Sequence, residues 1–489
     1  MTVQMKSSSI HSSDVKDPLD LEGGAVTTTD ADFGGPEQRR TLERRLLWKI
    51  DARMSILVII YILNYIDRNN AAAARLQGFE QDLGLHGQEF NTLLSILYVG
   101  YILMQIPSNM LLNWMGRPSL YLPTFMVVWG MISVLTGITT NFTGALLTRF
   151  FLGFVEAAFF PGSIFLLSKW YTKKELGFRM AFFYCGSISS NAFGALIASG
   201  ILRNMGGRLG HAAWRWLFYI EGAITMTVAV LAIFVLPDFP HNTRWLKPEE
   251  RALAQLRMAE DSVGQGDAGE TETGGFAHGL WLALLDWKVW FLAIVLTSFT
   301  VALSFNAFFP TLTATLGYNT TISLVLCAPP FIFAAIVAFT LNRHSDKVGE
   351  RYFHLSSSLC VGIIGYIIAM STLNTAARYV SLFLMAQSYA ALVTYVAWVA
   401  ATFPRPPSKR AVAIALVNAV SQLGNVAGSY VWPKSWGPTY HNSYAICIAT
   451  QGLTVVALWF FRMHLSRMNR KMEEEEEKGG KAKGFRFLT

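Results

Sequence analysis

TRFFLGFVEAAFFPGSIFLL, residues 148–167, is an apolar stretch that carries two full charges, Arg149 and Glu156. The two residues lie seven positions apart, so a helix would place them on one face, about two turns from each other. A charge near a bilayer centre costs roughly 2.5 to 3.5 kcal/mol on insertion scales, so the pair needs a partner, a ligand or a water-filled cavity. We interpret the stretch as a membrane-spanning helix with a functional polar face.

The composition of the whole chain also indicates a membrane protein. Of its 489 residues, 52% are hydrophobic and only 15% are charged, against about 25% charged in an ordinary soluble protein. We therefore predict an all-α polytopic membrane protein with twelve transmembrane helices in two six-helix bundles. Each predicted span is long enough to cross about 30 Å of hydrocarbon. The predicted spans are residues 52–70, 91–112, 119–139, 144–168, 178–202, 214–236, 288–310, 322–342, 354–373, 378–401, 411–432 and 443–463.

Polar segments divide the chain into five parts. The stretch from Asp261 to Gly275 has almost no apolar residue, as expected of a solvated linker between the two groups of spans. The predicted parts are a disordered cytoplasmic N-terminus (1–45), an N-terminal bundle (46–237), a cytoplasmic linker (238–286), a C-terminal bundle (287–465) and a cytoplasmic tail (466–489).

Lysine and arginine residues predict the orientation in the membrane. They collect in the flank before the first span, in the loop after the fourth and in the flank after the last; with an even number of spans these lie on one side. We expect both termini to be cytoplasmic and the plasma membrane to be the location. The net charge of +8 then reflects this topology and contact with anionic lipids rather than nucleic-acid binding, because the basic residues are divided among short loops.

Possible modification sites fit the same topology. The two N-x-Ser/Thr sequons begin at Asn141 and Asn319, both in loops assigned to the outer side, and both are possible glycosylation sites close to a span. The four cysteines, which lie within predicted spans, are expected to be free thiols in packed positions: Cys185, Cys327, Cys360 and Cys447.

Two landmarks recur in both halves. Arg179 opens the fifth span as Arg410 opens the eleventh, at an offset of 231, and Gly116 matches Gly349 after the second and eighth spans, at an offset of 233. Two offsets that differ by only two residues favour duplication, with a substrate site between the two halves near the middle of the membrane. The alternative is a coincidence among common loop residues.

The loop NRHSDKVGER, residues 342–351, resembles the loop motif of the major facilitator superfamily. The resemblance implies that Asp346 and Arg351 take part in charged contacts that latch the bundles together on the cytoplasmic side. The first copy, SNMLLNWMGR (108–117), keeps Gly116 and Arg117 but has Asn113 where the motif usually has Asp, so we expect a weaker first-half latch.

Four further motifs narrow the resemblance to the anion:cation symporter family, and within it to the fungal allantoate and nicotinate permease branch. They are NYIDRN (64–69), QIPSN (105–109), RFFLGFVE (149–156) and KRAVAIALVN (409–418), and the likeness covers roughly residues 45–465. Members of this family move small organic anions, commonly with protons. The resemblance implies that Arg68 and Arg149 bind the anion and that Asp67 and Glu156 couple protons.

Side-chain chemistry supports these roles independently. Arginine is always charged and grips a carboxylate with two hydrogen bonds, whereas a buried carboxyl group can take up and release a proton at useful pH. The alternative is that Asp67, Arg68, Arg149 and Glu156 form a buried ion-pair network that holds the first and fourth spans together.

Other polar residues could contact the ligand. Tyr65 and Tyr101 match family positions that face the cavity, although aromatic residues in spans are often packing residues. The eleventh span contains three amide side chains at helical spacing, Asn418, Gln422 and Asn425. Asn418 matches a family substrate position. The alternative role of these residues is hydrogen bonding between helices. Asn306 and Gln387 could face the cavity from the second half. Gly424, Gly428, Gly194 and Ala198 are interpreted as close-packing surfaces.

The chain lacks the motifs of several other classes. No Gly-rich loop ends in Gly-Lys-Ser/Thr, and all nine histidines lie in loops or at span ends. We therefore expect no ATP-binding P-loop, no metal, no cofactor and no enzymatic activity. A further alternative is a nutrient sensor that no longer transports. The presence of Asp67, Arg68, Arg149 and Glu156 disfavours it.

These observations predict a monomeric secondary active transporter that imports a small carboxylate, such as a vitamin acid or ureide, by proton symport with alternating access. The alternative function is export of an anionic secondary metabolite on the same scaffold. Substrate identity depends on the cavity shape made by many apolar side chains, which the sequence does not reveal.

Overall fold

The computed structural model describes residues 33, 35–243, 245–263, 275–403, 407–479 and 486–489. In these ranges the regular structure is entirely helical, without a β-strand. The predicted all-α fold is confirmed. The side chains of residues 106, 109, 113, 173, 174, 178, 181, 262, 263, 275–277, 407, 408, 411 and 479 lie outside the description, so the expectation placed on Asn113 does too.

Each of the twelve predicted spans coincides with one helix or with consecutive helices separated by a short break. The first-half helices are α1 (Pro36–Ala74), α2 (Phe79–Asp82), α3 (Glu89–Met115), α4 (Pro118–Gly137), α5 (Phe142–Glu156), α6 (Phe159–Trp170), α7 (Lys173–Asn204) and α8 (Ala213–Val235). The second-half helices are α11 (Trp287–Ala302), the short helix Leu303–Phe308, α12 (Phe309–Ala314), α13 (Thr320–Val325), α14 (Ala328–Val348), α15 (Tyr352–Ser371), α16 (Thr375–Ala386), α17 (Tyr389–Thr402), α18 (Pro407–Ser429) and α19 (His441–Gly479).

Within the described ranges, ten helical stretches are long and apolar enough to cross a membrane. The two predicted spans outside this group are those of α1 and α3. Helix α1 carries Asp51, Arg53, Asp67 and Arg68, so its most apolar part is flanked by charges at both ends. Of these four charged residues, Asp67 and Arg68 are the ones predicted at the functional site.

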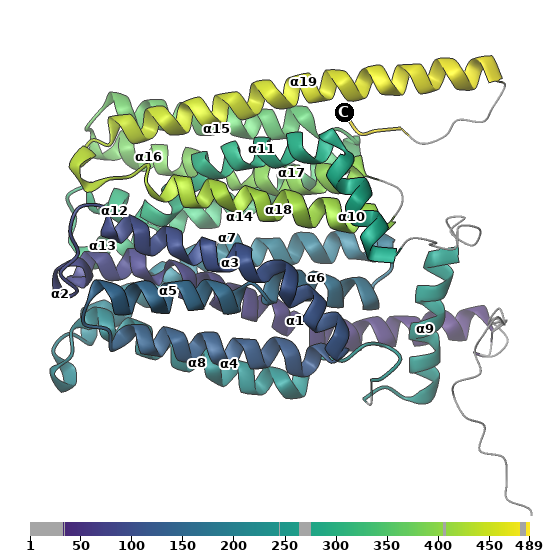
Figure 1. The fold of residues 1–489 in the computed structure, drawn as a ribbon, viewed down its shortest axis with the longest axis horizontal. Helices are drawn as coiled ribbons and strands as arrows, with labels where there is room; N and C mark the ends of the chain where they lie inside the picture. Colours follow the sequence, from purple (N-terminus) through teal and green to yellow (C-terminus); the bar gives the residue numbers. More distant parts are fainter. Residues whose placement is uncertain (1–32, 34, 244, 264–274, 404–406, 480–485) are drawn as a thin grey trace, which may run out of the picture.

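The helices run side by side in two groups, with α1 to α8 in one half of the molecule and α11 to α19 in the other (Figure 1). Helices α3 and α7 of the first half pack against α18 and α14 of the second. One buried apolar cluster is built from residues between Leu46 and Ala254 alone. The other cluster joins the second half to first-half residues near α2, such as Phe79 and Phe90. The halves thus share a core at the end of the molecule that bears α2.

Glycines allow close approach of the helices that carry the site. A Cβ atom added to Gly153 of α5 would overlap the carbonyl oxygen of Leu97 in α3. In the second half a Cβ at Gly424 of α18 would overlap Thr300 of α11, and one at Gly428 would lie 2.6 Å from Cβ of Ser304. The close-packing role predicted for Gly424 and Gly428 is confirmed.

Two spans are broken at corresponding places. Asn141 caps the start of α5, where its side chain accepts a hydrogen bond from the Gly144 amide at 2.8 Å, and the helix ends at Glu156 before α6 begins. The tenth span breaks at Gln387, between α16 and α17. Glu156 and Gln387 are separated by the same 231 positions as Arg179 and Arg410. The matching breaks add structural support to the duplication.

The polar segments contain more structure than the sequence predicts. Helix α1 begins at Pro36, so residues 36–45 are helical and the prediction that they are disordered is wrong. The linker holds α9 (Pro248–Val263) and α10 (Gly275–Leu285). The missed signal is apolar periodicity: Leu253, Ala254 and Leu256 recur among the charges of α9 and are buried. Helix α19 likewise continues through the predicted tail to Gly479.

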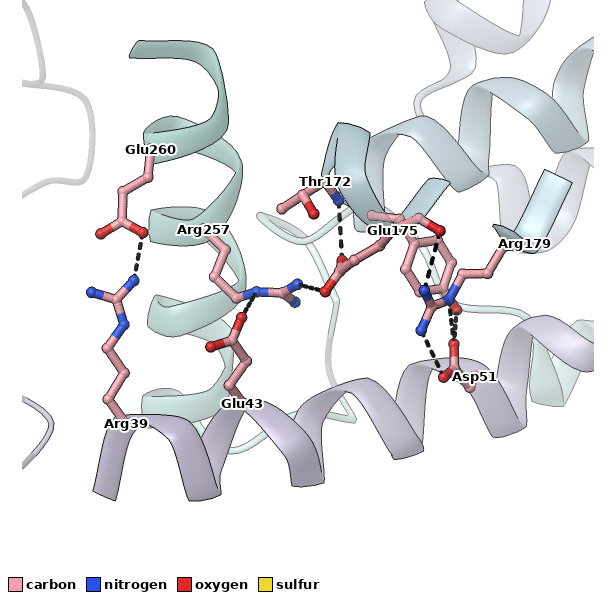
Figure 2. A network of polar contacts seen from close by, with 9 residues as sticks. Arg39, Glu43, Asp51, Thr172, Glu175, Arg179, Arg257 and Glu260 are labelled. Atoms are coloured by element: carbon pink, nitrogen blue, oxygen red, sulfur yellow. Dashed lines mark hydrogen bonds and ion pairs between the residues drawn. The ribbon is translucent and has the colours of Figure 1, made fainter. Parts of the chain in front are cut away.

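Charged side chains fix α9 to the first half. Arg257, only 4% exposed, forms ion pairs with Glu43 of α1 at 2.7 Å and with Glu175 of α7 at 2.5 Å (Figure 2). Burial raises the pKa of Glu250, but the hydrogen bond from Lys49 and the contacts with Lys247 outweigh burial, so its pKa lies below the usual range. Glu250 is therefore ionised at neutral pH, and its ion pair with Lys49 is kept.

The predicted modification residues have local structural roles. Asn319 caps α13 as Asn141 caps α5, by accepting a hydrogen bond from the Ile322 amide at 2.9 Å. Both asparagines are exposed, and only their carbonyl oxygens are used in the caps. The four cysteines are free, as predicted, but the packed position predicted for Cys360 is wrong because this residue is exposed.

Candidate functional site

The site begins with one ion pair between α1 and α5. Arg68 donates from Nε to Oε2 of Glu156 at 3.0 Å, and its Nη2 lies 2.9 Å from the same oxygen. Arg68 is 9% exposed and Glu156 is 1% exposed. The second oxygen of this carboxylate, Oε1, is buried without a hydrogen-bond partner. Glu156 is therefore held by a single cationic partner through one of its two oxygens.

Three tyrosine rings surround the Arg68 guanidinium. Its central carbon lies 5.2 Å from the ring centre of Tyr65, 5.9 Å from that of Tyr98 and 5.0 Å from that of Tyr101. Cation–π contacts of this kind stabilise a charge that is removed from water. The structure thus places Tyr65 and Tyr101 beside the arginine, and adds Tyr98, which sequence reasoning did not select.

Arg149 is bound to the backbone of α1 rather than to an acid. Its Nη1 donates to the Arg68 carbonyl at 3.2 Å and to the Asp67 carbonyl at 3.5 Å, and its Nη2 donates to Oδ1 of Asn70 at 2.8 Å. Its Nε has no partner, although the side chain is 1% exposed. Arg149 therefore ties α5 to α1 and keeps an unused donor.

Asp67 turns away from both arginines toward neighbouring hydroxyl groups. Its Oδ2 accepts a hydrogen bond from Thr225 of α8 at 2.7 Å, and its Oδ1 accepts one from Ser133 of α4 at 3.3 Å. The four charged residues lie on adjacent elements, but only Arg68 and Glu156 form an ion pair among them. The alternative of an ion-pair network through all four does not describe this conformation.

Two adjoining hollows border the charged residues. The first, which we name the arginine hollow, is lined by Arg68, Arg149, Asn69, Ala72, Tyr98 and Ala307 among others. The second, which we name the acceptor hollow, is lined by Asn69, Asn70, Ala72, Asn191, Glu221 and Asn306 among others. Asn69 and Ala72 border both hollows, which therefore meet at α1. Both hollows are also lined from both halves of the chain.

Sequence reasoning missed Glu221, although the signal was present. Glu221 lies inside the predicted span 214–236, so it is a third intramembrane acid by the same criterion that selected Glu156. It is 3% exposed, and its Oε2 has no hydrogen-bond partner. Asn306, which was only a weak candidate, lines the same hollow with a buried Oδ1 that is also unpartnered.

Other predicted residues lie elsewhere. Asn418 and Gln422 line neither hollow; the side chain of Gln422 accepts a hydrogen bond from Asn425 at 2.8 Å on the same helix. Gln387 is buried against Ser358, whose carbonyl accepts from its Nε2 at 2.7 Å, so it joins α16 to α15. The Gln387 contact joins two helices, whereas the Gln422–Asn425 contact lies within α18 and is not the hydrogen bond between helices that was the alternative for these residues.

The predicted gating residues make contacts within one half. Gly116 and Gly349 end α3 and α14 with φ values of 63° and 73°, a left-handed conformation that favours glycine. Asp346 pairs with Arg351 at 2.5 Å inside the α14–α15 loop, and Arg117 is exposed at the start of α4. None of the described gating side chains bonds across the two halves.

Polar contacts between the halves are found at one end of the molecule. Tyr430 of α18 lies within hydrogen-bond distance of Thr92 and Ser95 of α3, at 3.1 Å and 3.2 Å. Ser199 of α7 donates to the Thr321 carbonyl at 3.1 Å, and Lys434 pairs with Glu80 at 3.2 Å. All lie near α2, α12 and α13, opposite the end where α1 begins and α19 extends (Figure 1). Across the ranges that the structure describes, the halves form no hydrogen bond at the end that bears the termini.

No group of three or more histidine, cysteine, aspartate or glutamate side chains with metal-binding geometry occurs among the described residues. The polar side chains that line the two hollows include guanidinium, carboxyl, amide and phenol groups.

Comparisons with known proteins agree with this architecture. Residues 57–429 match the family model described as Major Facilitator Superfamily. The chain is 32% identical to "MFS-type transporter cnsO" of Penicillium expansum, over 98% of this chain and 100% of that protein. It is 30% identical to "Putative tartrate transporter" of Agrobacterium vitis, over 79% of this chain and 84% of that protein.

Solved structures share the fold at low sequence identity. The crystal structure of the D-xylose-proton symporter superposes with a TM-score of 0.62 and 16% identity, covering 83% of this chain and 97% of that one. A bacterial homologue of the human lysosomal transporter Spinster, in an inward-facing and occupied conformation, gives a TM-score of 0.62 and 17% identity, covering 84% and 95%. These likenesses support the predicted fold class.

Proposed function

Because the chain belongs to the major facilitator superfamily, a family of multi-pass membrane transporters rather than enzymes, we propose that it is a secondary active transporter of a small organic anion, driven by proton symport. The proposal places the protein in the anion:cation symporter family, in the branch of allantoate and nicotinate permeases. The anion is a carboxylate of the size of a vitamin acid or ureide.

The observation that carries the proposal is the ion pair of Arg68 with Glu156. A substrate carboxylate needs the guanidinium that Glu156 occupies, because arginine binds a carboxylate best through two donors on one edge. A proton on Glu156 removes its charge and frees Arg68 for the substrate. Proton and substrate then bind together because each removes the obstacle to the other.

Charge balance supports coupling to a cation. The buried ionisable residues around the two hollows are Arg68, Arg149, Asp67, Glu156 and Glu221, two positive and three negative when all are ionised. A bound anion would add to the net negative charge of these five residues, and the protein interior solvates charge poorly. Protons on the acids compensate for it, with Asp67 and Glu156 as the coupling residues.

We propose that transport proceeds by alternating access between two bundles, residues 46–237 and 287–465, around the hollows. The contacts of Tyr430, Ser199 and Lys434 then close the outer side, and the end that bears the termini faces the cytoplasm of a plasma-membrane protein. One relative supports the choice of a carboxylate, because it is named "Putative tartrate transporter".

The test is uptake into proteoliposomes of labelled carboxylates, including nicotinate, allantoate and tartrate, at outer pH 5 and pH 7.5, with and without a protonophore. We expect uptake of at least one carboxylate that rises at acid pH and collapses with the protonophore. Uptake that changes neither with the outer pH nor with the protonophore would overturn proton coupling. Efflux from preloaded vesicles without any uptake would replace import by export of an anionic metabolite.

A further inference from the structure

One buried arginine near the site has no role in the proposed transport mechanism. Arg75 follows the last residue of α1 and begins the short helix Arg75–Gln77, which leads into α2. Its side chain is 7% exposed, and its Nε lies 2.7 Å from Oε1 of Glu80. Its Nη1 is buried without a hydrogen-bond partner. Like Arg68, Arg75 is thus a buried guanidinium that is paired with one glutamate.

Arg75 belongs to a layer of three residues beside the arginine hollow. Its guanidinium carbon lies 4.4 Å from the ring centre of Phe90 in α3 and 5.9 Å from that of Phe308 in the second half. The two rings meet edge to face, with their centres 6.4 Å apart. We name these three residues the outer layer. Residues that line the hollow lie one helical turn or less along the chain from each member, on the side away from α2: Ala72, Leu93 and Ala307. The outer layer therefore lies between the arginine hollow and the end that bears α2.

The second half contributes two contacts to this closure. Phe308 stacks on Trp432, with ring centres 6.0 Å apart. Lys434, two positions after Trp432, lies 3.2 Å from Oε2 of Glu80, so Glu80 is shared between Arg75 and Lys434. Separation of the halves at this end would withdraw Phe308 and Lys434 together. Arg75 would then border an opening to the outer side.

Arg68 and Arg75 lie on one face of one helix. They are seven positions apart, and Arg75 keeps helical backbone angles (φ −53°, ψ −36°), so the two residues are separated by about 10 Å along the axis. The intervening stretch, NNAAAA (69–74), contains no charged residue. A carboxylate that leaves one arginine can therefore pass to the other over small, uncharged side chains.

We propose that Arg75 is an outer anion-binding residue, which binds the carboxylate before it reaches Arg68. This inference rests on the proposed function and adds a second binding step to it. In the closed conformation Glu80 occupies the guanidinium of Arg75, as Glu156 occupies that of Arg68. Once the second half withdraws, the carboxylate competes with Glu80, and Nη1 offers it a donor that has no partner in the closed conformation.

The test compares substitutions of the two partners of the outer ion pair, because a binding site and a structural latch respond differently to them. The variants are Arg75→Gln, Arg75→Lys and Glu80→Gln. The control is Arg208→Gln, which removes an exposed arginine from the loop between α7 and α8 at the same end of the molecule. The measurement is the KM for uptake of nicotinate, allantoate and tartrate into proteoliposomes, at ionic strengths of about 0.05 M and about 0.3 M.

We expect Arg75→Gln to raise the KM about tenfold or more, because the charge-assisted hydrogen bonds to the carboxylate are lost. Arg75→Lys should raise it about threefold, since lysine keeps the charge but not the fork. Glu80→Gln should lower it about threefold, because the competing carboxylate is removed. High ionic strength should raise the KM of the unaltered protein more than that of Arg75→Gln, since salt screens the attraction between anion and arginine. Arg208→Gln should change neither the KM nor its salt dependence by more than about twofold.

A structural latch predicts instead that loss of either partner of the ion pair moves the KM in the same direction, and this result would overturn the inference. An unchanged KM in Arg75→Gln would overturn it too, and in both cases carboxylate transport still stands. If Arg75→Gln does not fold, opposite shifts in Arg75→Lys and Glu80→Gln support the binding role and parallel shifts exclude it. If the unaltered protein takes up none of the three carboxylates, the proposed function fails and the inference falls with it.

Discussion

At the residue scale, the functional question is how two arginines beside three acids remain available to a ligand. Arg68 is shared between Glu156 and three tyrosine rings, whereas Arg149 is fixed by α1 carbonyl groups and Asn70. In the proposed mechanism a proton on Glu156 frees Arg68, whereas Arg149 is held in place by groups of α1. Variants of Glu156, the partner of Arg68, therefore test proton coupling, whereas variants of Arg149 test the geometry of substrate binding.

Glu156→Gln should abolish proton-driven accumulation and spare substrate exchange. Glutamine keeps the size of the side chain but cannot take up the proton that frees Arg68, so Arg68 is permanently available. The measurement is accumulation against exchange in proteoliposomes with an imposed pH gradient. Full accumulation by this variant would show that Glu156 does not couple protons.

Arg149→Lys should raise the KM for substrate by about tenfold or more, since a lysine cannot reproduce the planar fork that contacts Asn70 and the α1 carbonyls. Initial uptake rates over a range of substrate concentrations measure the effect. An unchanged KM with a lower melting temperature would assign Arg149 a structural role only.

At the element scale, position is set by close packing and by ion pairs outside the membrane. Gly153→Ala should destabilise the protein by about 1–3 kcal/mol or more, because the added Cβ overlaps the Leu97 carbonyl and forces α5 away from α3. Since α5 carries both Arg149 and Glu156, transport should fall in parallel. Thermal melting and uptake are the measurements. Gly200→Ala is the matched control on α7, where a Cβ meets no atom within 4 Å, and it should be neutral or slightly stabilising.

Arg257→Ala should release α9 from α1 and α7, because a single buried guanidinium pairs with both Glu43 and Glu175. Leaving those carboxylates without their partner costs more than losing an exposed pair. Faster hydrogen exchange or proteolysis within residues 248–263 is the expected result. The control is Glu260→Gln, which alters a glutamate that is 46% exposed and should have little effect. If residues 248–263 are equally protected from exchange and proteolysis in both variants, Arg257 does not hold α9 in place.

At the scale of the whole molecule, the two halves meet through polar contacts at the end opposite the termini. Tyr430→Phe removes the hydroxyl that approaches both Thr92 and Ser95 and should favour separation of the halves there. Spin-label distances between α3 and α18 should shift toward longer values. Tyr318→Phe, at an exposed tyrosine, is the control. An unchanged distribution would show that the apolar cluster near α2 alone holds this end closed.

The sequence by itself determined the fold class and the α1–α5 part of the site. Twelve apolar stretches predict a helical membrane protein because lipid requires every backbone group to be bonded within its own helix. The charges in NYIDRN and RFFLGFVE select the helices of the candidate site because an unpaired charge is costly in the bilayer. The helical structure of residues 36–45 and the docking of α9 were missed, since their apolar residues are few and their pairing partners lie far away in the chain.

Only the tertiary structure decided which polar groups face one another. Arg68 binds Glu156 while Asp67 bonds to Thr225 and Ser133, although Asp67 and Arg68 are adjacent in sequence, because neighbours on a helix point in different directions. Glu221 and Asn306 meet at one hollow only when the halves pack, whereas Asn418 and Gln422 stay outside it. Residue type and spacing show which charged side chains lie in a span and are therefore costly to bury. The partner that offsets this cost lies on another helix, and only the packing of the helices determines which one.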